Sequence, residues 1–304
     1  MDLSRKGTNF YSENVENSYL CAMKLEKKDK TLNQSLRIDV GDTIKSRLPR
    51  YYRFIPNPVI KWLERTICQD DLNGILQRTQ GKNGVKFCEA ALKDLGVTYS
   101  TLGEHPDKSN RRVIIVSNHP LGALDGIILI AWASRYFGCH IKFLVNDLLM
   151  AIKPLDDVFL PINKHGKQSR ASSEGIDNFL AGDEPIIIFP AGLVSRKHKD
   201  GIYDLKWQKM FVNKAIQYQR DIIPVYFDGL NSSFFYNFAK ARTKIGLKFN
   251  IEMIYLPREI FQSKNTHFNL TVGKTISWKQ LKGGSRAYLE AKAIKKIVYN
   301  LKQN

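Results

Sequence analysis

The features that mark secreted, membrane-spanning and metal-binding proteins are scarce in this chain of 304 residues. Its four cysteines lie far apart with no Cys-x-x-Cys pair, which predicts neither a disulfide framework nor a metal site and favours a reducing compartment. The polar N-terminus predicts no signal peptide. The longest apolar run, residues 127–133, is far shorter than the roughly 20 residues that span a bilayer. We therefore expect no transmembrane helix.

Acidic residues are also in short supply. The chain has 29 Asp and Glu against 47 Lys and Arg, which gives a formal net charge of +18. Such a surface attracts polyanions: nucleic acid, anionic lipid headgroups or an acidic protein. No helix-turn-helix, RNP-type or zinc-finger pattern is present, so we expect no nucleic-acid partner. No Gly-x-Ser-x-Gly nucleophile elbow occurs either, which disfavours a covalent acyl-serine enzyme.

Composition and periodicity divide the chain into three parts. Residues 1–35 are polar and are interpreted as a loose tail of the kind that can be disordered. Residues 36–108 predict a helical, basic and aromatic region, and residues 109–304 an α/β domain that ends in a basic amphipathic helix. Within the second part, the helix after Pro58 has an apolar face that includes Trp62. That face either packs on the main domain or lies on an anionic bilayer, and the two roles can coexist.

The third part alternates apolar runs with helical patterns. This alternation predicts an α/β fold with a mostly parallel sheet covered by helices on both faces. Strands are expected at residues 113–117, 141–145, 158–162, 185–189, 222–227, 249–254 and 268–272. Helices are expected at residues 126–136, 167–180, 207–218, 231–239 and 285–301, and a helix at residues 85–95 precedes them in the second part.

The most informative segment follows the first of these strands. Asn118 and His119 stand where the strand ends, and Asp125 stands where the next apolar segment begins. The carboxyl end of a strand is where open α/β sheets keep their chemistry. A neutral imidazole that is oriented by a carboxylate can take a proton from a hydroxyl group. The alternative is structural: His119 caps the helix and Asp125 solvates its first turn.

Three later segments change the balance between these interpretations. One strand ends in Asn-Lys at Lys164, and the strand after it breaks at Phe-Pro and turns at Gly192. A cluster of Ser195, Arg196 and Lys197 follows that turn, and the fourth segment contains Ile-Pro-Val within residues 222–227.

In this order the four segments resemble the conserved blocks of the glycerolipid acyltransferase superfamily, the lysophosphatidate acyltransferase type. The resemblance covers roughly residues 110–230. It implies the glycerolipid acyltransferase fold, with His119 as general base on an acceptor hydroxyl and Asp125 fixing the imidazole tautomer. It also implies substrate-binding roles at Asn118, Lys164, Gly192, Ser195, Arg196 and Lys197.

Several positions depart from the superfamily pattern. Five residues separate His119 from Asp125 where the superfamily has four, and Gly122 offers a place to absorb the insertion. Ala191 stands where the superfamily has Glu, and Val194 where it has Arg. In the second block Lys164 replaces Arg. Because the altered family positions bind glycerol phosphate, a different headgroup is expected.

The combination of blocks resembles a narrower branch, the bacterial hemolysin-type acyltransferases. This branch includes O-acyltransferases that make ornithine and glycine lipids. The resemblance implies acyl transfer from acyl carrier protein or CoA to the hydroxyl of a lyso-aminolipid, such as 3-hydroxyacyl-glycine or lyso-ornithine lipid. Further similarity to the branch lies at residues 69–70, Asp204, Leu205, Trp207 and Phe211.

The resemblance also implies partners and a location. The partners are acyl carrier protein or CoA, a lipid acceptor and an anionic membrane surface, and no cofactor or metal is expected. The location is the cytoplasmic face of the bacterial inner membrane, where the enzyme is peripheral. Arg196 or Lys164 is expected to pair with the acceptor carboxylate, and backbone N–H groups near Gly192 to form an anion pocket.

Other interpretations remain open. A 1-acyl-glycerol-3-phosphate acyltransferase of phospholipid synthesis would share the blocks. A non-catalytic lipid-binding or membrane-perturbing protein would keep the fold without turnover. Arg196 and Lys197 can also be a solvated charged loop, and Ser195 can simply bond its own turn.

Overall fold

A computed structural model describes residues 37–146, 152–162, 170–247 and 249–302. Internal contacts divide the chain into two units, residues 1–35 and residues 36–304. The tail expected at residues 1–35 lies outside the described residues. Everything below concerns the second unit.

Helices dominate the first part of this unit, as predicted. Pro58 lies in the first turn of α4, where its missing N–H removes no helical hydrogen bond. The expected stop of α6 at Gly96 is confirmed, since this glycine has φ +65° and a Cβ there would meet Asn265 Oδ1 at 2.1 Å. The helices are α2 (Val40–Arg47), α3 (Pro49–Tyr52), α4 (Asn57–Thr66), α5 (Gln69–Arg78) and α6 (Gly84–Asp94).

The rest of the unit is built on a seven-stranded sheet with the order β1-β9-β8-β2-β5-β3-β4 among the described residues. The β8–β9 pair is antiparallel and every other neighbouring pair is parallel, so the mostly parallel sheet is confirmed. The strands are β1 (Thr98–Gly103), β2 (Val113–Ser117), β3 (Lys142–Asn146), β4 (Phe159–Ile162), β5 (Ile186–Ile188), β8 (Asp221–Asp228) and β9 (His267–Val272).

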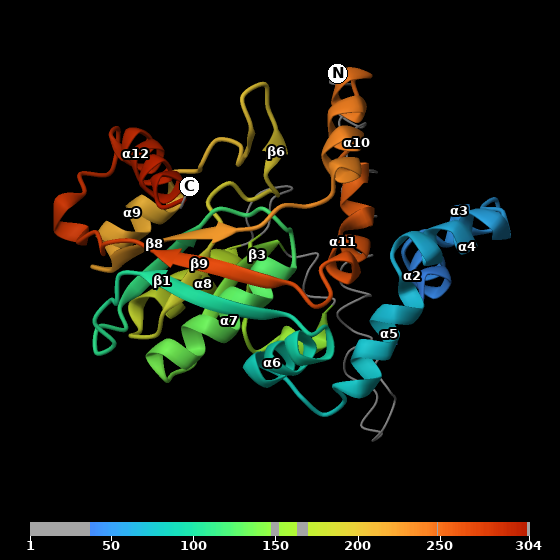
Figure 1. Cartoon of the computed structure of the whole chain (residues 1–304), viewed down its shortest axis with the longest axis horizontal. Helices are drawn as coiled ribbons and strands as arrows, with labels where there is room; N and C mark the ends of the chain where they lie inside the picture. Colours follow the sequence, from blue (N-terminus) through green and yellow to red (C-terminus); the bar gives the residue numbers. More distant parts are fainter. Residues whose placement is uncertain (1–36, 147–151, 163–169, 248, 303–304) are drawn as a thin grey trace, which may run out of the picture. The chain divides into compact units, whose positions relative to one another are not determined.

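Helices cover both faces of this sheet, as predicted (Figure 1). On one face, residues of α6 and α7 (Leu124–Phe137) form a core with the inward side chains of the strands. On the other face, α8 (Arg170–Ala181), α9 (Met210–Gln217) and α12 (Ala287–Asn300) form a second core. The central strand β2 is buried along its whole length, because it contributes side chains to both cores.

The remaining elements connect this layered core. A two-stranded antiparallel ribbon joins β6 (Arg196–Lys197) to β7 (Ile202–Tyr203). The segment between β8 and β9 contains α10 (Ser233–Lys244), η4 (Ile251–Tyr255) and α11 (Leu256–Gln262). Two further short turns of helix are η3 (Lys153–Leu155) and η5 (Trp278–Gln280).

Two sequence-based predictions are wrong. The strand expected at residues 249–254 is η4, because Glu252 turns inward to meet two arginines. The strand β1 was not expected, because it is an edge strand of mostly polar residues and has no buried apolar run. It pairs with β9 over six residues.

The helix expected to have an apolar face is only partly buried. In α4, Ile60 is buried, whereas Val59 and Trp62 are 43% and 49% exposed. Part of the face therefore packs on the protein and part stays open to solvent. Among the described residues, no helix is both long and apolar enough to cross a membrane.

Candidate active site

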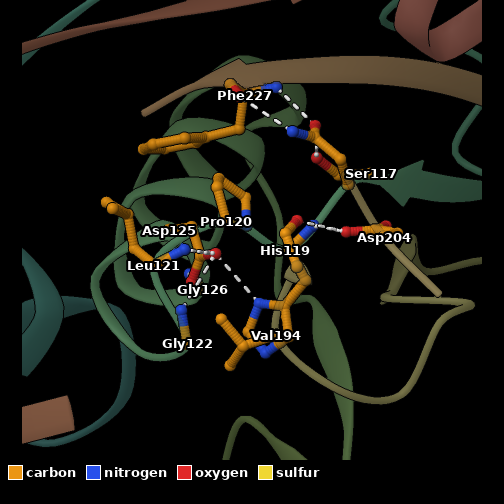
Figure 2. Close-up of polar contacts among 12 residues, drawn as sticks. Ser117, His119, Pro120, Leu121, Gly122, Asp125, Gly126, Val194, Asp204 and Phe227 are labelled. Atoms are coloured by element: carbon orange, nitrogen blue, oxygen red, sulfur yellow. Dashed lines mark hydrogen bonds and ion pairs between the residues drawn. The ribbon is translucent and has the colours of Figure 1, made fainter. Parts of the chain in front are cut away.

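The site is built on the turn between β2 and α7. After Ser117 the chain leaves the sheet, and α7 begins at Leu124, so Asp125 lies in the first turn of the helix while His119 lies on the turn before it. Nδ1 of His119 lies 2.9 Å from Oδ2 of Asp125 (Figure 2). The longer spacer therefore keeps the imidazole and the carboxylate in hydrogen-bond contact.

Asp125 is fully buried, and donors surround its carboxylate. Oδ2 also accepts hydrogen bonds from the backbone N–H groups of Leu121 at 2.9 Å and Gly122 at 3.3 Å. Oδ1 accepts one from the N–H of Gly126 at 2.9 Å. The start of a helix favours a negative charge at this position. The carboxylate is therefore held as an acceptor by three backbone N–H groups of its own turn, and the imidazole is its fourth partner.

This arrangement sets the tautomer of His119. Because Nδ1 faces an acceptor, it carries the hydrogen, and Nε2 is left with a free lone pair. The imidazole stacks on Phe189 with ring centroids 3.9 Å apart, and its side chain is 14% exposed. No described residue makes a hydrogen bond to Nε2. This atom is thus available to accept a proton from a bound hydroxyl group.

Gly122 gives the turn its shape. Its φ is +86°, and an added Cβ would lie 2.8 Å from side-chain atoms of both Leu256 and Val194. Only glycine combines this left-handed backbone with so close an approach. The prediction that Gly122 absorbs the extra spacer residue agrees with this geometry.

A second buried carboxylate, Asp204, connects the His119 turn to the segment after β5. Oδ1 accepts hydrogen bonds from the backbone N–H of His119 at 3.1 Å and from the Ser195 hydroxyl at 2.5 Å. Oδ2 accepts one from Trp207 Nε1 at 2.8 Å. The N–H of Ser195 also donates to the carbonyl of His119 at 2.8 Å. Sequence reasoning noted Asp204 only as a branch similarity and gave it no role.

Two asparagines fix the remaining backbone. Asn118 donates through Nδ2 to the carbonyl of Phe227 at 2.9 Å and accepts the N–H of Phe227 at 2.7 Å, which ties the end of β2 to β8. Asn231 donates through Nδ2 to the carbonyl of Pro120 at 3.1 Å. Asn118 thus uses both ends of its amide inside the protein, as a residue that shapes the loop does.

Buried phenols pack around this network. Burial raises the pKa of Tyr236 to about 12, so its hydroxyl stays protonated; it accepts from the N–H of Asn231 and donates to the carbonyl of Pro120. Burial also raises the pKa of Tyr299, whose hydroxyl accepts the N–H of Asp204 at 2.7 Å. The pKa of Lys295 is lowered by burial, and its ammonium donates to the carbonyls of Asp204 and Leu205.

The basic residues of the third block point elsewhere. Arg196 donates through Nη2 to Glu252 Oε1 at 2.8 Å and through Nη1 to the carbonyl of Val194 at 2.8 Å. Burial lowers the pKa of Arg196, and the charge of Glu252 opposes that shift. Exposed Lys197 donates to Asn237 Oδ1 at 3.0 Å. The structure therefore places an internal carboxylate on the guanidinium that was predicted to bind the acceptor.

The other predicted substrate-binding positions differ in their contacts. The N–H of Gly192 donates to the carbonyl of Phe189 at 2.9 Å, and Gly192 lines the cavity described below. Ser195 is buried and bonded to Asp204, so it serves the loop. Lys164 lies outside the described residues.

The departures from the superfamily pattern have a structural counterpart. Val194, in place of Arg, is fully buried in an apolar cluster with Phe235, Tyr236 and Leu256. Ala191, in place of Glu, is buried in the core beneath α9 and α12. Neither position could hold a charge without a partner, since burying an unpaired charge is costly.

An apolar cavity of about 800 Å³ opens beside His119. Its size lies within the ordinary range for small-molecule sites. Side chains from both cores line it, with Phe143 and Val145 from one face of the sheet and Leu144 from the other. A cavity of this lining suits hydrocarbon chains, and a proton acceptor stands in its wall. Within the described ranges, no three His, Cys, Asp or Glu side chains gather closely enough to hold a metal ion.

Comparison with known proteins gives the class of enzyme to which this site belongs, an acyltransferase. The acyltransferase family model matches residues 43–304, and the chain belongs to this family.

Relatives with named activities narrow the comparison. The chain is 38% identical over 264 residues to a lyso-glycine lipid O-acyltransferase of Bacteroides thetaiotaomicron, covering 87% of this chain and 97% of that protein. It is equally similar to the lyso-glycine lipid O-acyltransferase of Phocaeicola vulgatus, of which it covers 95%. The predicted superfamily and aminolipid branch are thereby confirmed.

A solved structure also matches weakly. It is the 1-acyl-sn-glycerophosphate acyltransferase of Thermotoga maritima, with a TM-score of 0.42 and 16% identity over 87% of this chain and 98% of that one.

Proposed function

We propose that this acyltransferase moves a fatty acyl group from the thioester of acyl carrier protein or CoA to the hydroxyl of a lyso-glycine lipid, that is, a 3-hydroxyacyl-glycine. The observation that carries the proposal is the His119–Asp125 pair, whose imidazole lines an apolar cavity of about 800 Å³. The similarity to two lyso-glycine lipid O-acyltransferases supports the choice of acceptor.

The reaction follows from the tautomer. Nε2 of His119 takes the proton of the acceptor hydroxyl as its oxygen attacks the thioester carbonyl carbon. The carbon–sulfur bond then breaks, and the imidazolium returns the proton to the leaving thiolate. Asp125 stabilises the imidazolium and holds the ring in place. No covalent enzyme intermediate is needed, because the hydroxyl attacks directly.

The acceptor headgroup is a small carboxylate. Arg196 is paired with the carboxylate of Glu252, so its charge is already matched inside the protein. Lys197 is exposed and donates to the neutral amide of Asn237. Lys164 is the remaining predicted partner of the acceptor carboxylate, and its role stays a prediction. The proposed glycine headgroup of the acceptor is therefore supported by the similarity to the two lyso-glycine lipid O-acyltransferases.

We also assign the enzyme to a membrane surface. Both substrates carry long chains, and the formal charge of +18 attracts anionic lipid as well as the acidic acyl carrier protein. The proposed location is the cytoplasmic face of the bacterial inner membrane, which the protein visits without spanning it.

The test is a mass-spectrometric assay of the purified protein. It receives acyl-carrier-protein thioester or acyl-CoA with three acceptors in parallel: 3-hydroxyacyl-glycine, lyso-ornithine lipid and lysophosphatidate. We expect O-acylated glycine lipid, lost by roughly three orders of magnitude in His119→Ala. His105→Ala, on an exposed histidine outside the site, is the matched control and should keep full activity.

Each other outcome has a definite meaning. Product from lysophosphatidate alone would contradict the proposed acceptor and support phospholipid synthesis. Acylation that survives in His119→Ala would contradict the assigned general base. Lipid binding without turnover on any acceptor would favour the non-catalytic interpretation.

A further inference from the structure

The segment between β8 and β9 forms an arm of two antiparallel halves. Figure 1 shows α10 and α11 as an orange column between the end of β8 and the start of β9. The chain runs out along α10, which ends at Lys244, and returns through η4 and α11. We call residues 245, 247 and 249 the arm tip.

The arm tip exposes large apolar side chains to solvent. Ile245 is 72% exposed, Leu247 43% and Phe249 80%. The side chains of Lys240 and Lys244 are exposed on the last turns of the adjoining helix. Three apolar side chains are thus exposed within five residues, with cations beside them. Burial in the acyl region of a bilayer favours the apolar side chains, and anionic headgroups attract the lysines.

The backbone around the arm tip is fixed by internal contacts. Buried Arg242 donates through Nη1 to the carbonyl of Leu247 at 2.5 Å and through Nη2 to Asn250 Oδ1 at 3.1 Å. Gly246, with φ +79°, ends α10 and donates its N–H to the carbonyl of Thr243. The hydrogen bonds at Gly246, Leu247 and Asn250 therefore fix the backbone on both sides of the exposed apolar side chains.

A buried ion cluster anchors the arm to the site loop. Glu252 on η4 is fully buried, and its carboxylate pairs with Arg242 on α10 and Arg196 on β6, each at 2.8 Å. At the other end, Ser232 donates its backbone N–H and its hydroxyl to Glu259 of α11 at 2.6 Å. Both ends of the arm are thus held by charged contacts.

The arm also forms part of the cavity wall. Met253, Leu256, Pro257 and Ile260 line the cavity, and Leu256 packs against Gly122 of the catalytic turn. Along the same arm, the rings of Phe234, Phe238 and Tyr255 contact one another, and Phe234 is 47% exposed. Apolar surface therefore runs along the arm from the exposed tip to the cavity lining.

We infer that the arm tip inserts into an anionic lipid bilayer and places the cavity beside the acceptor lipids. The choice of a lipid bilayer as the partner rests on the proposed function, because an enzyme with an amphiphilic acceptor has to reach the membrane that holds this acceptor. Ile245, Leu247 and Phe249 enter the acyl boundary, and Lys240 and Lys244 lie at the level of the lipid phosphates. The bilayer then supplies the acyl-bearing acceptor along the apolar side of the arm.

Vesicle binding tests this inference. The full chain and the double variant Ile245→Asp/Phe249→Asp are mixed with vesicles of equal parts phosphatidylcholine and phosphatidylglycerol, and the bound fraction is measured by flotation. We expect the double variant to bind at least ~10-fold more weakly, because burial of each large side chain is worth about a tenfold factor or more. Leu289→Asp is the matched control: Leu289 is 63% exposed on α12, and its variant should bind as the parent does.

Two further measurements make the result decisive. Phe249→Trp should show quenching by lipids brominated in their acyl chains, beyond the quenching of the parent. The double variant should acylate acceptor in detergent micelles at the parent rate and acceptor in vesicles more slowly.

The outcomes separate this inference from the proposed function. Equal vesicle binding by parent and double variant, or an equal loss in Leu289→Asp, would overturn the assignment of the tip. Loss of acyl-carrier-protein binding with vesicle binding intact would assign the tip to a protein partner instead. If the parent binds through the tip yet acylates no acceptor, the proposed function fails while the docking surface stands.

Discussion

The carboxylate of Asp204 accepts a hydrogen bond from the backbone N–H of His119 at 3.1 Å across 85 positions of sequence. The same oxygen accepts the hydroxyl of Ser195, so one buried group sets the positions of the first and third blocks. His119 is thus oriented twice: Asp125 holds its ring, and Asp204 holds its backbone.

Asp204→Asn tests the backbone role. An amide has only one acceptor oxygen, so one of the three donors on this carboxylate is left unpaired in the interior, at about 1–3 kcal/mol of unfolding free energy. We expect kcat to fall more than KM rises, because the imidazole shifts relative to the thioester. Urea unfolding and steady-state kinetics measure both, and Ser195→Ala, which removes only one donor, should show the smaller effect. Full activity in Asp204→Asn would contradict the positioning role.

Asp125→Asn tests the ring orientation. The amide can offer its oxygen to Nδ1 only by turning its NH₂ toward the N–H of Gly126, which now points at Oδ1, so either the tautomer or the contact with Gly126 is lost. We expect kcat to fall by about three orders of magnitude. Circular dichroism and thermal unfolding of the same sample establish that the fold persists. A variant that folds and retains most of its turnover would show that the carboxylate does not assist the imidazole.

Part of this site follows from the sequence, and part does not. The pairing of His119 with Asp125 was anticipated because His119 stands at the end of an apolar strand and Asp125 where the next apolar segment begins. The arm was misread: Glu252 lies among apolar neighbours that suggest a strand, and its two partners are 56 and 10 positions away in the chain. No local pattern reveals such a cluster, because it depends on how the arm folds back on the loop.

The same limit explains the other omissions. The strand β1 lacks the continuous apolar run that marks a buried strand. It lies at the edge of the sheet, where its side chains are only partly buried. Asp204 lies in a segment of ordinary composition, and its three donors come from residues 119, 195 and 207. Its role depends on tertiary proximity.

Gly122→Ala tests the turn that carries the site. The variant combines an unfavourable positive φ with contacts of 2.8 Å to Leu256 and Val194. Gly138→Ala is the control, because that glycine also has positive φ but has no neighbour within 4 Å of an added Cβ. We expect Gly138→Ala to lose about 1 kcal/mol of unfolding free energy and Gly122→Ala at least about 2 kcal/mol, with reduced kcat. Equal losses of unfolding free energy in the two variants would mean that Leu256 and Val194 move away from the added methyl group without a measurable cost.

Arg196→Gln separates a structural role from a substrate-binding one. The side chain is 12% exposed and paired with fully buried Glu252, so its removal leaves that carboxylate with Arg242 alone. We expect a loss of about 3 kcal/mol in unfolding free energy and an unchanged KM for the acceptor. Lys197→Gln, on the exposed neighbour, should change stability by less than about 0.5 kcal/mol. A large rise in acceptor KM with stability intact would restore Arg196 to the headgroup site.

Ala91→Phe tests whether the cavity holds an acyl chain. Ala91 lies on α6 and lines the cavity, so a phenyl ring there occupies space that a long hydrocarbon chain would need. We expect activity with long-chain thioesters to fall about tenfold or more relative to short-chain ones, since each excluded methylene forfeits about 0.8 kcal/mol of burial. Competition between thioesters of two chain lengths measures this ratio directly. Ala90→Phe, one position along the same helix and outside the cavity lining, should leave the ratio unchanged. If Ala91→Phe folds and keeps the chain-length preference of the parent, the acyl chain does not pass α6. The acyl chain would then be assigned to the half of the cavity beneath α8 and α9.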